Sequence, residues 1–292
     1  MTDSKRKTPT VPSDKLFLGL TLMALAMFII PVRDGLAKHM SATLPVFTVA
    51  WGTYCAAALF AAPIAFRLHG RTALVPSGLR SQTARTLLLV GSMTMFFFSV
   101  RTVPLANAIA AYFVAPFVAT ALAPLVLGER LTWVIAGAVL IGFVGVLIVL
   151  QPDGNFDFNI LWAVAAGLLF AFYMLATRLA ARQAPPLAAL SYQSILGALV
   201  LTPFAFGAGI QGMTSFLGLF ALIGILQSVS HGLSIAAFRF APASILAPLV
   251  YLEIVAAVIV GLVAFGDWPS SQTWIGIAII IAAGVLVSIQ RK

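Results

Sequence analysis

Apolar residues occur along this chain in long runs that are separated by short polar connections. Each run approaches the roughly 20 residues that an α-helix needs to cross about 30 Å of hydrocarbon. The pattern therefore predicts an all-α membrane protein with ten transmembrane helices. The predicted spans are residues 16–36, 44–66, 85–101, 105–127, 131–150, 160–180, 187–209, 214–237, 243–264 and 272–290.

The composition agrees with this pattern, because 61% of the residues are hydrophobic and only 9% are charged. No water-soluble domain of this length could place so many apolar side chains on its surface. Residues 1–15 are polar, basic and rich in Thr, Ser and Pro, which predicts a disordered tail. The single cysteine, Cys55, excludes an internal disulfide, and no spacing of His or Cys predicts a metal site.

Basic residues give the chain a formal net charge of +9 and gather in the short connections. With the N-terminus placed in the cytoplasm, all of them face the cytoplasm except Arg33, Lys38 and Arg101. Short cytoplasmic loops are the ones that carry an excess of Lys and Arg. We therefore expect both termini in the cytoplasm, and we attribute the positive charge to topology rather than to binding of nucleic acid.

The sequence also contains an internal duplication. Three landmarks recur at an offset of 138 residues: Arg101, Pro104 and Gly128-Glu129 match Arg239, Pro242 and Gly266-Asp267. This repetition predicts two five-helix halves, residues 16–151 and 157–290. Because five is odd, the second half must enter the membrane from the opposite side, which makes the repeat inverted. Folds of this kind bind their solute near mid-membrane between the halves and work by alternating access.

Two motifs near the end of the first half resemble a known family. PLVLGERLT (Pro124–Thr132) and GAVLIGFVGV (Gly137–Val146) are similar to the drug/metabolite transporter superfamily and, more narrowly, to its EamA-type exporters. The second half departs from the pattern at Gly266-Asp267-Trp268-Pro269. The resemblance covers residues 16–290 and implies a gradient-driven carrier of small metabolites in a bacterial inner membrane. It extends to the YddG-type amino-acid exporters and implies no cofactor.

Glu253 is the first candidate for a functional residue. It falls within the predicted span 243–264, where a charged carboxylate costs at least about 2.5 kcal/mol. Its repeat partner is Ala115, in a stripe of small residues that includes Ala111 and Ala119 and favours close helix packing. We therefore expect Glu253 on an inward face, as a proton site or as a contact for a substrate ammonium group. The alternative is a protonated glutamate that holds two helices together.

Three further groups of polar residues fall in or beside the spans. Gln227 and His231 are four residues apart and hence share a helix face, where His231 could relay protons or simply pack. Arg33 and Arg101 are expected near the outer ends of their spans, where they could bind a carboxylate or extend to the headgroups. Deeper aromatic hydroxyls need polar partners, which favours an interior position or a cavity wall for three residues: Tyr54, Tyr112 and Tyr173.

Spans four and nine are predicted to be irregular. A proline removes one backbone hydrogen bond and kinks a helix, and freed carbonyls inside a bundle can act as ligands or hinges. These two spans are the expected gates, marked by Asn107, Pro116, Pro242 and Pro248.

The sequence as a whole predicts a secondary carrier rather than an enzyme or a channel. No ATP-binding loop or catalytic motif is found, and no helix carries the repeated polar face of a pore. The expected activity is export of small metabolites, first of all amino acids, including hydrophobic and aromatic ones, coupled to protons or to exchange. The alternative is an importer of a vitamin or nucleoside-like solute. The sequence predicts no oligomeric state.

Overall fold

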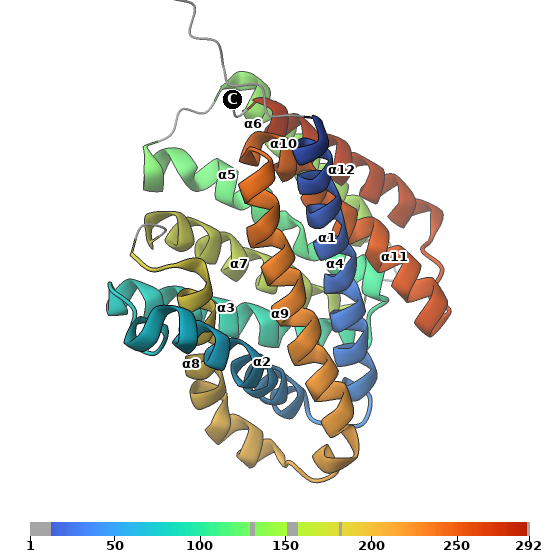
Figure 1. Ribbon diagram of the computed structural model, residues 1–292. Helices are drawn as coiled ribbons and strands as arrows, with labels where there is room; N and C mark the ends of the chain where they lie inside the picture. Colours follow the sequence, from blue (N-terminus) through green and yellow to red (C-terminus); the bar gives the residue numbers. More distant parts are fainter. Residues whose placement is uncertain (1–12, 129–131, 151–156, 181–182, 291–292) are drawn as a thin grey trace, which may run out of the picture.

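The computed structural model describes residues 13–128, 132–150, 157–180 and 183–290 (Figure 1). Within these ranges the chain forms α-helices and short 3-10 segments, with no β-strand. Ten of the described helical segments are long and apolar enough to cross a membrane, which confirms the predicted all-α membrane fold. Of the predicted N-terminal tail, residues 1–12 lie outside the described ranges, and Ser13 already begins a helix.

The first half contributes six α-helices: α1 (Ser13–Ser41), α2 (Val46–His69), α3 (Leu79–Val100), α4 (Leu105–Tyr112), α5 (Val114–Leu127) and α6 (Trp133–Leu150). Several bounds differ from the prediction, and the largest differences among the α-helices of this half are that α1 continues beyond residue 36 and that α3 begins before residue 85. Charged side chains ended the predicted spans at these points. Inside a folded bundle, however, a charge with a partner or a cavity does not interrupt the helix.

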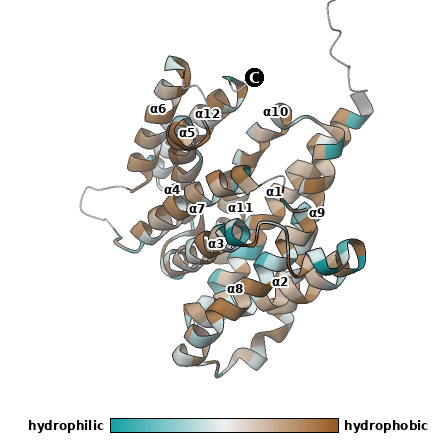
Figure 2. Cartoon of the chain, turned by 90° about the vertical axis from the view of Figure 1, so that its left-hand side faces the viewer, coloured by the Kyte–Doolittle hydropathy of each residue, from teal (hydrophilic) through white to brown (hydrophobic). Residues whose placement is uncertain are grey.

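The second half contributes α7 (Ile160–Ala180), α8 (Pro186–Ala208), α9 (Leu217–Phe240), α10 (Ala243–Leu246), α11 (Leu252–Phe265) and α12 (Ser271–Gln290). Short 3-10 segments lie at Gly70–Ala73, Met213–Phe216 and Ala247–Tyr251. Large apolar side chains such as Leu125, Trp133 and Val263 are exposed, as expected of helices that face lipid. Figure 2 shows hydrophobic residues over most of the helical surface.

Span four is broken into α4 and α5, with Phe113 between them. The break lies where Pro116 lacks the N–H that would bind the carbonyl of Tyr112, four residues earlier. Gly167 of α7 lets the chains approach closely here, because a Cβ atom at this glycine would stand 2.6 Å from the Tyr112 carbonyl oxygen. The predicted irregularity of span four is therefore confirmed, and α7 covers it.

Span nine is broken at the matching place. The chain runs through α10 and the 3-10 segment Ala247–Tyr251, which contains Pro248, before α11 begins. Helices α5 and α11 each have 14 residues and each end at a glycine with positive φ, 68° at Gly128 and 69° at Gly266. A left-handed glycine is a common helix ending. Glu129 and Arg130, which complete the predicted turn of the first half, lie outside the described residues.

The two halves interlock rather than stand side by side. Helix α3 packs on α7 as α9 packs on α1, and α5 packs on α7 as α11 packs on α1. The largest other contacts between the halves join α2 to α8, α6 to α12 and α2 to α9. Exchanging the halves maps the first four contacts onto one another in pairs and the α2–α8 and α6–α12 contacts onto themselves, which is the pattern expected of a two-fold axis. The α2–α9 contact departs from it, because it is more extensive than its counterpart between α3 and α8. Figure 1 shows α1 and α9 side by side, and Figure 2 shows α6 beside α12.

Candidate substrate site

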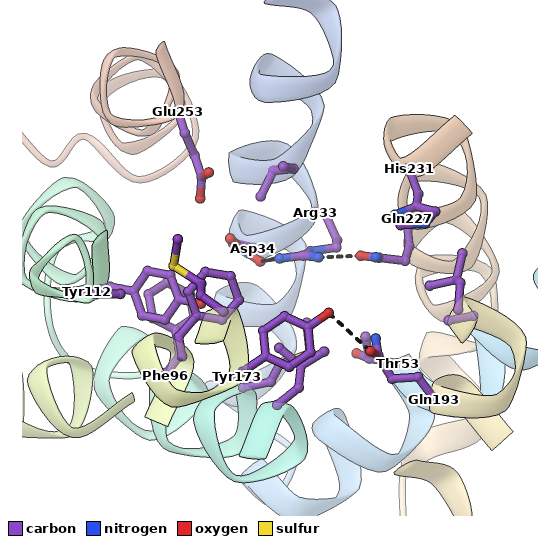
Figure 3. Close-up of a pocket in the computed structure, with 18 of the residues that line it drawn as sticks. Arg33, Asp34, Thr53, Phe96, Tyr112, Tyr173, Gln193, Gln227, His231 and Glu253 are labelled. Atoms are coloured by element: carbon purple, nitrogen blue, oxygen red, sulfur yellow. Dashed lines mark hydrogen bonds and ion pairs between the residues drawn. The ribbon is translucent and has the colours of Figure 1, made fainter. Parts of the chain in front are cut away.

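A cavity of about 370 Å³ lies between the halves. Helices α1 to α5 of the first half and α7, α8, α9 and α11 of the second half all contribute to its lining, while α6, α10 and α12 supply none of its lining residues. Polar side chains project into it from several of these helices (Figure 3). The cavity thus lies at the interface where folds with an inverted repeat bind their solute.

The first polar group in the cavity is an ion pair on α1 that extends to α9. Arg33 donates to Oδ1 of Asp34 from Nε at 2.9 Å and from Nη2 at 2.5 Å, and its Nη1 donates to Oε1 of Gln227. Asp34 is only 2% exposed. The charges of Arg33 and Asp34 compensate each other, so this group is polar but carries no net charge.

Glu253 points into the cavity from the first turn of α11 (Figure 3). Within the described part of the chain its carboxylate has no hydrogen-bond or ion-pair partner. Tyr251 and Phe113 are in tilted ring contact, with centroids 5.4 Å apart, so the two broken spans meet beside the cavity.

A row of aromatic rings forms one wall. Phe96 contacts Tyr112 at a centroid distance of 5.3 Å, Tyr112 contacts Phe170 at 5.1 Å, and Phe170 stacks on Tyr173 at 5.3 Å. We call these four residues the aromatic row. Rings in offset or tilted contact present flat apolar surface against which a planar solute can stack.

A second polar group lies at the Tyr173 end of the aromatic row. Arg85 of α3 is 8% exposed and stands over the Tyr173 ring, 5.5 Å from its centroid. Its Nη2 donates to Oε1 of Gln193 at 3.3 Å, and the Tyr173 hydroxyl donates to the same oxygen at 3.3 Å. Three buried polar atoms at the cavity have no hydrogen-bond partner among the described residues: Nε of Arg85, the hydroxyl of Tyr54 and Nε2 of His231.

The cavity is closed at one end of the bundle. At the α1–α2 and α3–α4 connections Met40, Val100 and Leu105 are fully buried. An ion pair seals the same end: Lys38 Nζ lies 2.9 Å from Oδ2 of Asp267 and donates to the Val103 carbonyl at 2.9 Å. At the other end the lining reaches Pro186, the first residue of α8.

The structure brings most of the sequence-predicted site residues together. Eight of them line the cavity: Arg33, Tyr54, Tyr112, Pro116, Tyr173, Gln227, His231 and Glu253. The others lie elsewhere. Arg101 is exposed at the end of α3, and Asn107 donates to the Thr273 hydroxyl at 3.3 Å. Pro242 and Pro248 flank the break of span nine without lining the cavity. The described residues contain no cluster of His, Cys, Asp or Glu fit for a metal ion.

Five polar lining residues were not expected at the site: Asp34, Thr53, Arg85, Gln193 and Ser194. All five are buried. Asp34 and Arg85 lie at or near the ends of the predicted spans 16–36 and 85–101. Hydropathy alone gives no reason to place such charges at a cavity rather than at a span end.

Comparison with protein families matches this chain twice to the EamA-like transporter family, at residues 17–151 and at residues 157–289. A crystal structure of another protein superposes with a TM-score of 0.62 over 95% of this chain and 97% of that one. Its sequence identity is 18%, so the likeness concerns the fold.

Several named proteins are similar over nearly their full length. The S-adenosylmethionine uptake transporter of Rickettsia prowazekii (strain Madrid E) is 26% identical over 276 residues, which cover 94% of this chain and 93% of that protein. The riboflavin transporter of Rhizobium johnstonii is 26% identical, with 98% and 96% covered. The pseudopaline exporter CntI of Pseudomonas aeruginosa is 25% identical, with 96% and 99% covered. All three names describe transporters, and they differ in solute and in direction.

Proposed function

Because the chain belongs to the EamA-like transporter family, we propose that it is a secondary carrier for a small metabolite with an ammonium group and a flat ring-bearing portion. It is a multi-pass transporter of a bacterial inner membrane and not an enzyme. Amino acids, including aromatic ones, are the first class of cargo. The observation that carries the proposal is Glu253, whose carboxylate faces a cavity between the two halves and has no ion-pair partner among the residues that the structure describes.

The chemistry of the lining supports this cargo. An ammonium group of a solute supplies the positive charge that Glu253 lacks, and a charge-assisted hydrogen bond is about twice as strong as a neutral one. The aromatic row supplies the apolar surface for the rest of the solute. Arg33 is compensated by Asp34, so it holds the shape of this part of the site without adding net charge.

The arrangement of the two halves supports alternating access. One end of the cavity is sealed by buried residues and by the pair of Lys38 and Asp267, while the lining reaches the opposite end at Pro186. With both termini in the cytoplasm, as the distribution of basic residues favours, the sealed end faces outward. The solute then enters from the cytoplasm, and rearrangement of the broken spans four and nine opens the other end.

A second candidate is uptake of a nucleoside-like or vitamin-like solute. The observation in its favour is the likeness to proteins named for S-adenosylmethionine uptake and riboflavin transport. The same cavity suits such solutes, because the aromatic row stacks a heterocycle as well as a phenyl ring.

Counterflow in proteoliposomes tests both candidates. Vesicles loaded with unlabelled solute are diluted into labelled L-tyrosine, L-phenylalanine, S-adenosylmethionine or riboflavin, with empty vesicles as the control. We expect transient accumulation of at least one solute that bears an amino group. Exchange of riboflavin alone would contradict the requirement for an ammonium group, and exchange of none of the four would contradict both candidates. Accumulation in inside-out and right-side-out vesicles under a proton gradient then gives the direction.

A further inference from the structure

Arg85 is a buried cation for which the described residues provide no ion-pair partner. It lies in α3 at the cavity wall and is 8% exposed. Its only hydrogen bond among the described residues goes to the neutral amide of Gln193, at 3.3 Å, and its Nε has no partner. The ring of Tyr173 lies 5.5 Å from its guanidinium carbon.

This state is unusual for an arginine. Burial of an uncompensated charge is costly, and buried arginines are normally paired with a carboxylate. Arg33 in the same cavity shows the normal case, because it is paired with Asp34 at 2.5 Å. A guanidinium has five N–H donors in a planar fork that matches a carboxylate or phosphate. Most of the donor capacity of Arg85 is therefore unused and adjoins the cavity.

Glu253 is the counterpart of Arg85. It is the acidic residue of the cavity without a partner in the described chain, since Asp34 is taken by Arg33. The aromatic row separates the two charges: Arg85 stands over Tyr173 at one end, and Glu253 projects above Tyr112 toward the other (Figure 3). No ion pair joins them. The cavity thus has the negatively charged Glu253 at one end, a flat apolar wall, and the positively charged Arg85 at the other end.

We propose that Arg85 binds an oxyanion of the transported solute, a carboxylate or a phosphate, at the end opposite the ammonium group. This inference rests on the proposal that the cavity is the transport site, and it adds to the amino acids of that proposal a class that should bind more tightly: elongated solutes whose two charges lie on either side of a flat portion. In a simple aromatic amino acid the ammonium and carboxylate groups are bonded to the same carbon. Such a solute can therefore contact Glu253 or Arg85, but not both at once.

Rigid probes of matched shape test this assignment. The first, 4-(2-aminoethyl)benzoate, has an ammonium group and a carboxylate at opposite ends of a ring, and its methyl ester lacks only the negative charge. The matching phosphate monoester of tyramine places a phosphate at the same end. Binding to the purified full-length protein is measured by calorimetry and by thermal shift.

We expect the wild-type protein to bind the acid or the phosphate at least about tenfold more tightly than the ester, the loss expected for one charge-assisted hydrogen-bonded pair. Whichever anion is preferred identifies the oxyanion. Arg85→Gln should remove the preference, and Glu253→Gln should weaken the acid and the ester alike. Arg80→Gln, an exposed arginine on the same helix, should change neither.

Equal binding of the acid, the phosphate and the ester by the wild-type protein would overturn the assignment, as would absence of binding by all three. These two results need no variant, so they hold even if Arg85→Gln does not fold. A preference that survives in Arg85→Gln would overturn it as well. The outcome is separable from the proposed function, because counterflow of an amino acid without any preference for the anion leaves the carrier proposal intact.

Discussion

At the scale of single residues, the charges of this cavity fall into two kinds. Arg33 and Asp34 satisfy each other and belong to the framework, whereas Glu253 and Arg85 line the cavity without an ion-pair partner among the described residues. A buried ion pair adds little to stability by itself, but removal of one partner leaves a costly unpaired charge. Substitution of the two kinds of residue should therefore have different effects, on folding in the first case and on transport in the second.

Glu253→Gln should lower counterflow of the solute at least about tenfold, because the neutral amide cannot pair with an ammonium group. The melting temperature in detergent should stay close to that of the wild type. Asp157→Asn, an exposed acid at the start of α7, is the matched control and should leave transport unchanged. Counterflow that persists in Glu253→Gln while proton-driven accumulation disappears would contradict an ammonium contact and identify a proton site.

Asp34→Asn should destabilise the fold by roughly 3 kcal/mol, because it leaves the Arg33 guanidinium without its compensating charge. The effect is measured as a lower melting temperature in detergent. The double variant Arg33→Met with Asp34→Leu removes both charges and should recover most of the loss. If the single and double variants melt at the same temperature, the ion pair is not what stabilises this region.

At the scale of elements, the two interrupted spans define the site. Pro116 explains where α4 ends. Its missing N–H removes one helical hydrogen bond of the preceding turn, and its ring clashes with the carbonyl group four residues earlier. The break would expose backbone groups to lipid if nothing covered it, and unsatisfied backbone is not tolerated there. Helix α7 provides the cover through Gly167. The roles of Pro116, Pro242 and Pro248 in gating stay predictions.

Gly167→Ala should therefore destabilise the protein by about 1–3 kcal/mol, the usual cost of overpacking. The added Cβ would stand 2.6 Å from the carbonyl oxygen of Tyr112 and 2.6 Å from Cγ1 of Val114. Gly137→Ala on α6 is the control, since a Cβ there meets no atom within 4 Å. Thermal unfolding in detergent compares the two. Equal melting temperatures would show that α7 does not fit the break as closely as inferred.

At the scale of the whole molecule, the exchange of contacts between the halves gives a physical basis for two alternating states. A solute-sized cavity reaches one end of the bundle, and the pair of Lys38 and Asp267 ties α1 to the α11–α12 connection at the other. A contact formed in only one state shifts the equilibrium by its own free energy.

Asp267→Asn should shift the population toward the state that is open at the Lys38 end. A partly exposed ion pair contributes about 1 kcal/mol, which corresponds to about a fivefold change in population. The measurement is the rate at which an impermeant maleimide labels Val103→Cys, a buried position at this end, in a Cys55→Ser background. Labelling should quicken about fivefold.

The charge swap Lys38→Asp with Asp267→Lys should reverse the effect. An unchanged labelling rate in Asp267→Asn would show that the pair of Lys38 and Asp267 does not hold this end closed.

The sequence by itself determined the membrane class, the ten spans, the irregularity of spans four and nine, and the inward placement of Glu253. Each of these follows from local rules: the length of an apolar run, the chemistry of proline, and the cost of a carboxylate in hydrocarbon. The family resemblance on Pro124–Thr132 was confirmed as well. Cargo and direction stay proposals, since the relatives differ in both.

Only the tertiary structure decided which charges are compensated. Arg33 and Asp34 are neighbours in sequence, but nothing local shows that both are buried with Gln227, nor that Arg85 forms no ion pair with a carboxylate of the described chain. Whether a charged side chain is buried, and whether it has an ion-pair partner, depends on helices that are far apart in the chain. These helices supply the neighbouring groups in place of lipid and water. For this reason the sequence could locate polar residues at membrane depth, and the fold was needed to show which of them face the cavity with an unused charge.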